Sequence, residues 1–199
     1  MALTIGITGG IGSGKSTVGQ IFKILGIPLF EADLVAKTLI NSNQEVRNGL
    51  IQLFGREIYG SDNRINRKML ANLIFNDDNL LKKVNQLVHP AVRNEFTNWM
   101  KLQDSEYIIH EAAILFESGF YKMMDYNILV SAPEEMRIER VCKRENITPE
   151  KVRERMAKQW PDEEKRKLTT LEIVNDNKKL IIPQIVEIDK NLKTHGKIW

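Results

Sequence analysis

Eight residues near the N-terminus have types and spacing that suit the binding of a phosphate chain. Gly9–Ser16 has the sequence Gly-Gly-Ile-Gly-Ser-Gly-Lys-Ser and fits the pattern G-x-x-x-x-G-K-[ST] at every fixed position. Glycine has no Cβ, so it adopts positive φ freely and lets backbone N–H groups turn inward around an anion. Lys15 would then reach the β- and γ-phosphates, and the Ser16 hydroxyl would ligate Mg²⁺. The motif therefore predicts a site for a nucleoside triphosphate.

The segments on both sides of this phosphate loop have the patterns that it requires. Leu3–Ile7 is an apolar run directly before the loop, typical of a buried strand. A helix directly after it is indicated by apolar residues at i, i+3, i+4 and i+7, namely Val18, Ile21, Phe22 and Leu25. Its N-terminus would add unpaired N–H groups and a positive dipole end to the phosphate site. A glycine-rich turn of some other α/β fold is the alternative.

The rest of the chain alternates between predicted strands and helices. The further strands are expected at Ile27–Phe30, Tyr107–Ile109, Tyr126–Val130 and Leu171–Val174. Residues 43–103 have helical patterns and no convincing strand, which predicts a helical insertion. Five strands separated mostly by helices imply a parallel sheet, in which ligands gather beyond the carboxyl ends of the strands. Asp33, Glu111 and Asn175 should therefore share one face with the phosphate loop.

Composition restricts the class of protein. The 199 residues are 42% hydrophobic with a formal net charge of +3, which allows one sizeable domain and indicates no nucleic-acid partner. No run approaches the length of apolar residues that a membrane span needs, and we expect no export leader. The single cysteine, Cys142, cannot form an internal disulfide, so we expect a cytoplasmic protein. Nothing in the composition predicts an oligomeric state.

Several side chains outside the loop could take part in the chemistry. Asp33, just past a strand, could accept the proton of an attacking hydroxyl, or it could be the N-cap of the next helix, and the local sequence supports both equally. Glu111 and Glu117 could hold Mg²⁺ through water, although a surface position is the commoner place for a glutamate. His89, before Pro90, could bind a substrate or finish the preceding helix.

Three arginines share a stripe in a helical pattern. Arg137, Arg140 and Arg144 are spaced i, i+3 and i+7, which would aim their guanidinium groups in one direction. Guanidinium suits phosphate because its planar fork matches phosphate oxygens. A solvated helix face with charged pairs is the competing interpretation of the helix as a whole.

Further short motifs occur at Gly6–Thr17, Ala32–Asp33, Phe54–Gly55, Arg67, His89–Pro90, Leu115–Glu117, Arg140 with Arg144, Gln159 and Asn175. Together these motifs resemble the dephospho-coenzyme A kinase family over nearly the whole chain. The chain departs from the family pattern in three places. Glu31 stands where aspartate is usual, Ala113 replaces a proline, and Thr169–Thr170 replaces Ala-Asp. None of these departures removes a group assigned to catalysis.

The resemblance implies a single domain, 1–199, with a three-layer P-loop kinase fold and a five-stranded parallel sheet. Its core is expected at about 1–42, 104–135 and 165–199, with a helical acceptor-binding insertion at about 43–103 and a helical lid at about 136–164.

The resemblance also implies roles for individual residues. Asp33 becomes the base and contacts the acceptor, Lys15 and Arg140 become the other catalytic residues, and Arg67 and His89 become candidates for acceptor binding. The residues expected to bind ATP are Gly10, Ile11, Gly12, Ser13, Gly14, Lys15, Ser16, Thr17, Arg144 and Asn175. The implied cofactors are ATP and Mg²⁺, with Ser16 as the metal ligand, and the implied substrate is dephospho-coenzyme A.

Other classes of nucleotide-binding protein fit less well. A GTP-dependent switch or a motor domain lacks support, since no D-x-x-G follows the loop, and Asn177–Leu180 lacks the aspartate of the guanine-binding N-K-x-D. Another P-loop small-molecule or nucleoside monophosphate kinase is a closer alternative, because a fold does not determine the acceptor.

Overall fold

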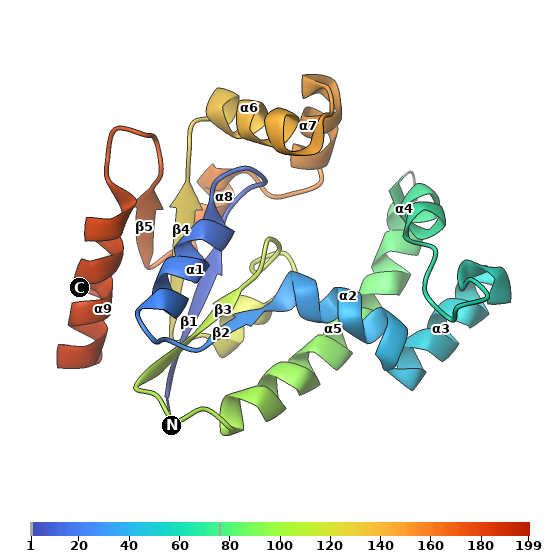
Figure 1. Ribbon diagram of the computed structural model, residues 1–199, viewed down its shortest axis with the longest axis horizontal. Coiled ribbons are helices and arrows are strands. Elements are labelled where there is room, and N and C mark those ends of the chain that lie inside the picture. Colours follow the sequence, from blue (N-terminus) through green and yellow to red (C-terminus); the bar gives the residue numbers. More distant parts are fainter. Residues whose placement is uncertain (1, 76) are drawn as a thin grey trace. The chain divides into compact units, whose positions relative to one another are not determined.

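The computed structural model describes residues 2–75 and 77–199 and contains a five-stranded sheet in the order β2-β3-β1-β4-β5 (Figure 1). Neighbouring strands pair in parallel. The strands are β1 (Leu3–Thr8), β2 (Leu29–Glu31), β3 (Tyr107–Glu111), β4 (Tyr126–Ser131) and β5 (Leu171–Val174). The predicted parallel sheet is confirmed. Strand β3 runs further than predicted, so that Glu111 is its last residue and not part of the following loop.

The chain forms two compact units. The sheet unit comprises the residues up to Glu31 together with Gln103–Trp199, and the helical unit comprises Ala32–Leu102. The helices of the sheet unit are α1 (Lys15–Ile24), the 3₁₀ helix η2 (Phe120–Met123), α6 (Glu134–Glu145), α7 (Pro149–Met156), α8 (Asp162–Arg166) and α9 (Ile181–His195). Those of the helical unit are α2 (Ala32–Ser42), α3 (Gln44–Phe54), the 3₁₀ helix η1 (Arg56–Ile58), α4 (Arg67–Phe75) and α5 (Asp78–Lys101).

One face of the sheet is apolar and packs against α1 and α9. Ile5 and Ile7 on β1 are fully buried there, because alternate residues of a strand point to the same face. Val18 and Phe22 on α1 belong to the same core, and α1 also contacts α9. The other buried members are Ile27, Tyr107, Ile109, Ile128, Val130, Ile173, Ile185, Ile188, Leu192 and Ile198. The phosphate loop therefore connects two elements that are anchored in one core.

The opposite face of β1 packs against the segment that follows β3. A Cβ atom at Gly6 would lie 2.7 Å from Cδ2 of Leu115 and 2.8 Å from Oδ1 of Asn127, so only glycine fits between them. His110, on the same face of β3, is fully buried. Its ring stacks between Phe30 and Phe120, with ring centroids 5.4 Å and 4.7 Å away.

The burial of His110 predicts a dependence of stability on pH. Desolvation lowers the pKa of His110 from 6.5 to about 4, so the unfolded chain binds a proton that the folded chain excludes between these values. The stability that this provides is complete above pH 6.5 and is lost as the pH falls toward 4, by on the order of 3 kcal/mol. Urea unfolding of the wild type and of His110→Phe across this pH range tests it. The difference between the two free energies should shrink or reverse on acidification, and a constant difference would contradict the prediction.

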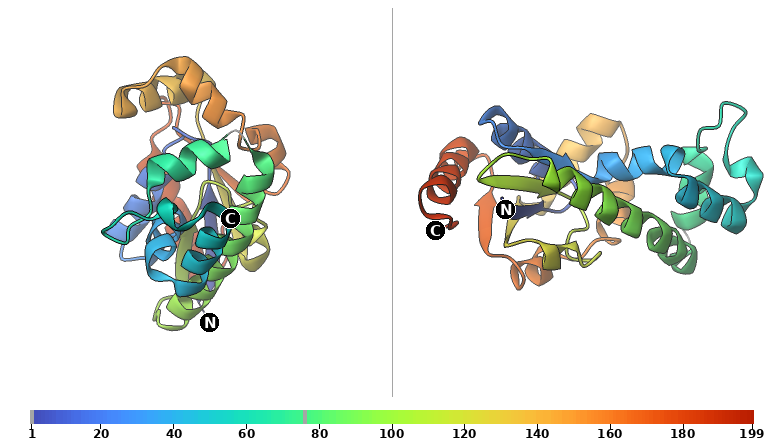
Figure 2. Two further views of the ribbon diagram at one scale, coloured as in Figure 1. Left: turned by 90° about the vertical axis from the view of Figure 1, so that its right-hand side faces the viewer. Right: turned by 90° about the horizontal axis from the view of Figure 1, so that it is seen from below.

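Strand β5 forms one edge of the sheet, with α9 running beside it (Figure 2). The side-chain amide of Gln184 on α9 is paired with the backbone of Val174. Its Oε1 accepts from the Val174 N–H at 3.0 Å, and its Nε2 donates to the Val174 carbonyl at 3.1 Å. The last residue of this edge strand therefore has both of its peptide groups satisfied, the N–H and the C=O, without a neighbouring strand.

The helical unit is built around α5. A buried stripe of Val84, Val88, Val92 and Phe96 repeats every four residues along that helix. Pro90 lies inside α5, so the interpretation that His89-Pro90 finishes a helix is wrong. Proline removes one backbone hydrogen bond, and the buried stripe on both sides of it explains why the helix continues. Among the helices of residues 2–75 and 77–199, none is long and apolar enough to cross a membrane.

Candidate active site

The phosphate loop joins β1 to α1, and its last glycine begins the helix. Gly14 is the N-cap of α1 with φ 97°, a conformation that favours glycine. A glycine has no side chain that could cap the helix, so the N–H groups of the first turn remain for an anion. Gly12 also has positive φ, and a Cβ there would lie 2.5 Å from the Arg137 carbonyl of α6. Glycine at position 12 thus both permits the positive φ and allows α6 to approach the loop closely.

Lys15 and Ser16 meet one buried carboxylate. Oε1 of Glu111 lies 3.5 Å from Nζ of Lys15 and accepts a hydrogen bond from Oγ of Ser16 at 3.3 Å. Glu111 is only 4% exposed because it ends β3, directly beside Ile7 of β1. The strand order therefore brings this carboxylate to the loop, as the sequence predicted for an acid at the end of β3.

The carbonyl groups of the loop are held from outside by two side chains. The Arg140 guanidinium donates to the Gly12 carbonyl at 3.5 Å and to the Asn175 carbonyl at 3.2 Å. Nδ2 of Asn175 donates to the Ser13 carbonyl at 2.8 Å. Arg140 and Asn175, both predicted from the sequence, thus contact the loop itself.

Of the three arginines of α6, Arg137 and Arg140 contact the phosphate loop and Arg144 does not, so the prediction of one shared direction is wrong for Arg144. Arg137 is buried and pairs with Asp162 at 3.2 Å, with its guanidinium against Gly10. Arg144 has a side chain 62% exposed and pairs with its neighbour Glu145 at 2.5 Å. Each guanidinium follows the nearest carboxylate or carbonyl, which spacing along a helix cannot reveal. The role of Arg144 in ATP binding stays a prediction.

Figure 1 shows α6 and α7 beyond the carboxyl ends of the strands of the sheet unit, on the side of the phosphate loop. A hollow of about 400 Å³ lies there, lined by Gly10, Glu134, Arg137, Arg153, Met156, Ala157, Gln159, Trp160 and Pro161. This hollow reaches the phosphate loop at Gly10, and its charged lining residues are Glu134, Arg137 and Arg153.

The other predicted residues belong to the helical unit. Asp33 is the second residue of α2, so it lies within the first turn and is not the N-cap, and that alternative is wrong. Arg67 is the first residue of α4, and His89 lies within α5. Burial lowers the pKa of His89, and the charge of Arg93 acts in the same direction. The roles of these three residues stay predictions.

Two of the departures from the family pattern lie in well-connected positions. The carbonyl of Ala113 accepts from Thr8 Oγ1 at 3.3 Å, and a backbone carbonyl is available whatever the side chain. Thr170 pairs with Asn127 of β4 in both directions, donating its N–H at 2.7 Å and accepting at Oγ1 from the Asn127 N–H at 3.1 Å. Neither departure removes a contact of the phosphate loop.

The sheet order, the loop and its lysine, serine and arginine contacts define a phosphate-loop protein of the α/β class. The family model described as dephospho-CoA kinase matches residues 3–180. A dephospho-CoA kinase of Porphyromonas gingivalis is 39% identical over 193 residues, covering 96% of this chain and 95% of the relative. The chain belongs to the dephospho-CoA kinase family.

Solved structures agree with this assignment. A crystal structure of a protein from Thermus thermophilus has a TM-score of 0.84 and 32% identity, covering 98% of this chain and 99% of the other. A dephospho-CoA kinase from Campylobacter jejuni has a TM-score of 0.72 and 25% identity, covering 99% of this chain and 100% of the other. The predicted P-loop kinase fold is thus confirmed.

Proposed function

We propose that this protein transfers the γ-phosphate of ATP to the ribose 3′-hydroxyl of dephospho-coenzyme A, giving coenzyme A and ADP. The observation that carries the proposal is the meeting of Lys15, Ser16 and Glu111 at the N-terminus of α1, in a chain of the dephospho-CoA kinase family. A new O–P bond forms at the acceptor oxygen, the bond between the γ-phosphorus and the bridging oxygen breaks, and the hydroxyl proton passes to a base.

The phosphate loop binds the donor. Its inward N–H groups and the first turn of α1 receive the phosphate oxygens, and Lys15 exchanges Glu111 for the β- and γ-phosphates. Arg140, already at the loop, is the second cation for the charge that develops during transfer. Arg140 also donates to Asn177 Oδ1 at 2.9 Å.

The residues at the loop also fit Mg²⁺. This ion prefers hard oxygen ligands and takes one or two protein groups beside phosphate oxygens and water. The Ser16 hydroxyl and the Glu111 carboxylate are such ligands, and they lie 3.3 Å apart. Bound there, the ion would neutralise phosphate charge. Glu117 is engaged elsewhere, with Lys165 at 3.3 Å, so Glu111 is our candidate for the supporting acid.

We assign the acceptor side to the helical unit. Asp33 lies two residues after Glu31, the last residue of β2, and is our candidate for the base that takes the hydroxyl proton. Arg67 and His89 are candidates for binding the acceptor. Residues 136–164 are proposed to act as a lid that excludes water from the transferring phosphate. A cytoplasmic location is part of the same proposal.

The test is a panel of acceptors with ATP. Purified protein should phosphorylate dephospho-coenzyme A in the presence of Mg²⁺, and chelation of the metal should abolish turnover because charge on the phosphates is then not neutralised. Shikimate, nucleoside monophosphates and pantetheine serve as competing acceptors, with product mass as the readout. Efficient phosphorylation of one of these and none of dephospho-coenzyme A would overturn the substrate assignment.

A further inference from the structure

Lys165 is a charged side chain that is fully buried. Its Nζ lies 3.3 Å from Oε1 of Glu117 and 3.4 Å from the carbonyl of Ala113, and its side chain is 0% exposed. Burial lowers the pKa of Lys165, and the negative charges of Glu117 and Asp162 oppose that shift. A buried ion pair of this kind contributes little to stability compared with apolar residues of the same volume. Its position relative to the phosphate loop suggests another use.

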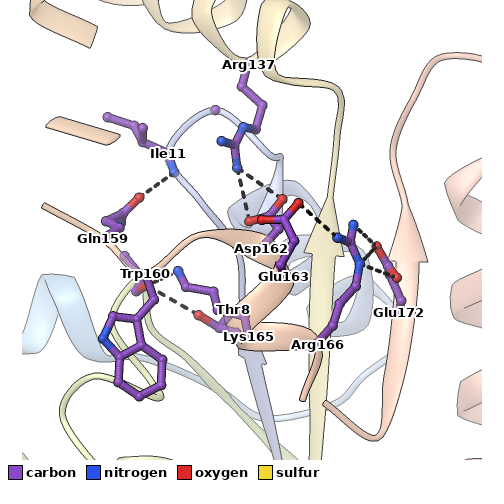
Figure 3. Close-up of polar contacts among 12 residues, drawn as sticks. Thr8, Ile11, Arg137, Gln159, Trp160, Asp162, Glu163, Lys165, Arg166 and Glu172 are labelled. Atoms are coloured by element: carbon purple, nitrogen blue, oxygen red, sulfur yellow. Dashed lines mark hydrogen bonds and ion pairs between the residues drawn. The ribbon is translucent and has the colours of Figure 1, made fainter. Parts of the chain in front are cut away.

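Hydrogen bonds connect this pair to Thr8, at the end of β1, and to Ile11 in the phosphate loop (Figure 3 labels Lys165, Thr8, Gln159 and Ile11). On one side, the Ala113 carbonyl that receives Lys165 also accepts from Thr8 Oγ1 at 3.3 Å, at the entry to the loop. On the other side, Oε1 of Glu117 accepts from the backbone N–H of Trp160 at 2.9 Å. The preceding residue, Gln159, accepts at its Oε1 from the Ile11 N–H at 2.9 Å. Lys165 and Glu117 therefore link the two ends of the segment Thr8–Ile11.

A second contact of α8, made by Asp162 through Arg137, supports the segment Thr8–Ile11. Asp162, the first residue of α8, holds Arg137 through hydrogen bonds of 3.2 Å to both carboxylate oxygens. The Arg137 guanidinium lies directly on Gly10, where a Cβ would come within 2.2 Å of Nη1. Gln159, in the turn before α8, and Asp162 and Lys165, within α8, therefore all make contacts that lead to the loop.

We propose that Lys165 is a positioning residue for phosphoryl transfer. Through Ala113 and Glu117 it holds in place the segment Thr8–Ile11, which comprises the last residue of β1 and the first half of the phosphate loop. The second half of the loop is held separately, by α1 and by Asn175. The proposal rests on the proposed function, because it needs a transfer step whose geometry the loop controls. It adds a residue whose side chain is 0% exposed.

Because the two halves of the loop are held separately, loss of Lys165 should affect kcat and ADP affinity differently. In this proposal the first turn of α1 and Lys15 bind the β-phosphate, which ADP also carries. The charges of Lys15 and Lys165 repel each other, but the contacts that hold Lys165 go to Glu117 and to the Ala113 carbonyl. Loss of Lys165 should therefore leave ADP affinity within about twofold of the wild type, as expected for groups with no shared partners. The transfer step needs the loop within a fraction of an ångström, and a displacement of about 1 Å from a distant change can cost about 10²-fold in kcat.

The experiment compares five variants of the full chain with the wild type. Lys165→Met removes the ammonium group, Glu117→Gln removes the carboxylate charge, and the double variant removes both. Gln159→Ala breaks the link at Ile11 without touching the buried pair, so it remains informative if Lys165→Met fails to fold. Lys167→Met is the matched control, since that lysine is on the same turn of the chain with a side chain 66% exposed. The readouts are kcat, ADP affinity and melting temperature.

We expect Lys165→Met and Gln159→Ala to lower kcat by about 10- to 100-fold with ADP affinity kept, and Lys167→Met to resemble the wild type. The double variant should lose less than the product of the single losses, since it leaves no unpaired buried charge. Unchanged kcat in folded Lys165→Met or Gln159→Ala would overturn the proposal. A parallel loss of kcat and ADP affinity that matches the loss of folded protein would also overturn it, because that result would indicate a purely structural role. Failure of wild-type turnover with dephospho-coenzyme A would instead contradict the proposed function, and the variants would then be compared with the acceptor that is used.

Discussion

Replacing Lys15 with alanine is expected to lower kcat by about 10²- to 10³-fold or more, the loss typical of removing one preorganised group that stabilises transition-state charge. The fold should be kept, because Lys15 is not part of the apolar core that holds α1 against the sheet. Glu111 loses the ammonium at 3.5 Å but keeps its hydrogen bond from Ser16 at 3.3 Å. Steady-state kinetics with dephospho-coenzyme A, together with circular dichroism, measure both parts of the expectation.

The control for this change is Lys23→Ala. Lys23 is a basic residue in the last turn of the same helix and is exposed, so its removal changes the net charge equally without reaching the loop. Near-normal turnover in a folded Lys15→Ala protein would mean that the phosphate loop is not the catalytic site.

Asp33→Asn is expected to lower kcat by about 10²- to 10⁴-fold, since asparagine can hold the acceptor hydroxyl but cannot take its proton. The position of Asp33 in the first turn of α2 limits the effect on stability. A carboxylate near a helix N-terminus is worth about 0.3–1 kcal/mol, so the melting temperature should change little. ATP affinity should also stay close to that of the wild type. Kinetics and nucleotide titration together separate these quantities.

Glu45→Gln is a matched control for Asp33→Asn. Glu45 is an acidic residue in the first turn of α3, in the same helical unit, so its substitution removes a comparable interaction with a helix N-terminus. The two variants should have similar melting temperatures and very different turnover. If kcat of Asp33→Asn is intact, Asp33 is an ordinary first-turn residue, and Glu111 becomes the next candidate for the base.

The parts of the site that depend on local sequence were predictable. The loop pattern, the apolar strand before it and the helix after it lie within 25 residues, and the structure has β1, loop and α1 in that order. Asn175 was expected near the loop because it follows a strand end, whereas Arg140 was singled out by the resemblance to the family. The parallel sheet followed from strands that alternate with helices.

The remaining features depend on contacts between distant segments. Lys165 lies in a run of charged residues, Asp162–Lys167, which predicts an exposed helix. Its burial arises only because α8 packs on β4 and brings it to Glu117, which is 48 positions earlier in the chain. The direction of Arg144 was mispredicted for a similar reason, since a neighbouring carboxylate outweighs helical spacing. Asp33 was mistaken for a possible cap because a helix boundary cannot be located to one residue from propensity.

The pairing of Gln184 with Val174 has a consequence for how the molecule behaves at high concentration. An edge strand with unpaired peptide groups is a template on which a strand of another chain can add, which is a route to aggregation. The Gln184 amide makes the same two hydrogen bonds to Val174 that an incoming strand would make, at 3.0 and 3.1 Å. An approaching strand would have to displace a side chain that its own helix holds in place. The carboxyl end of β5 is thereby blocked against intermolecular β-pairing.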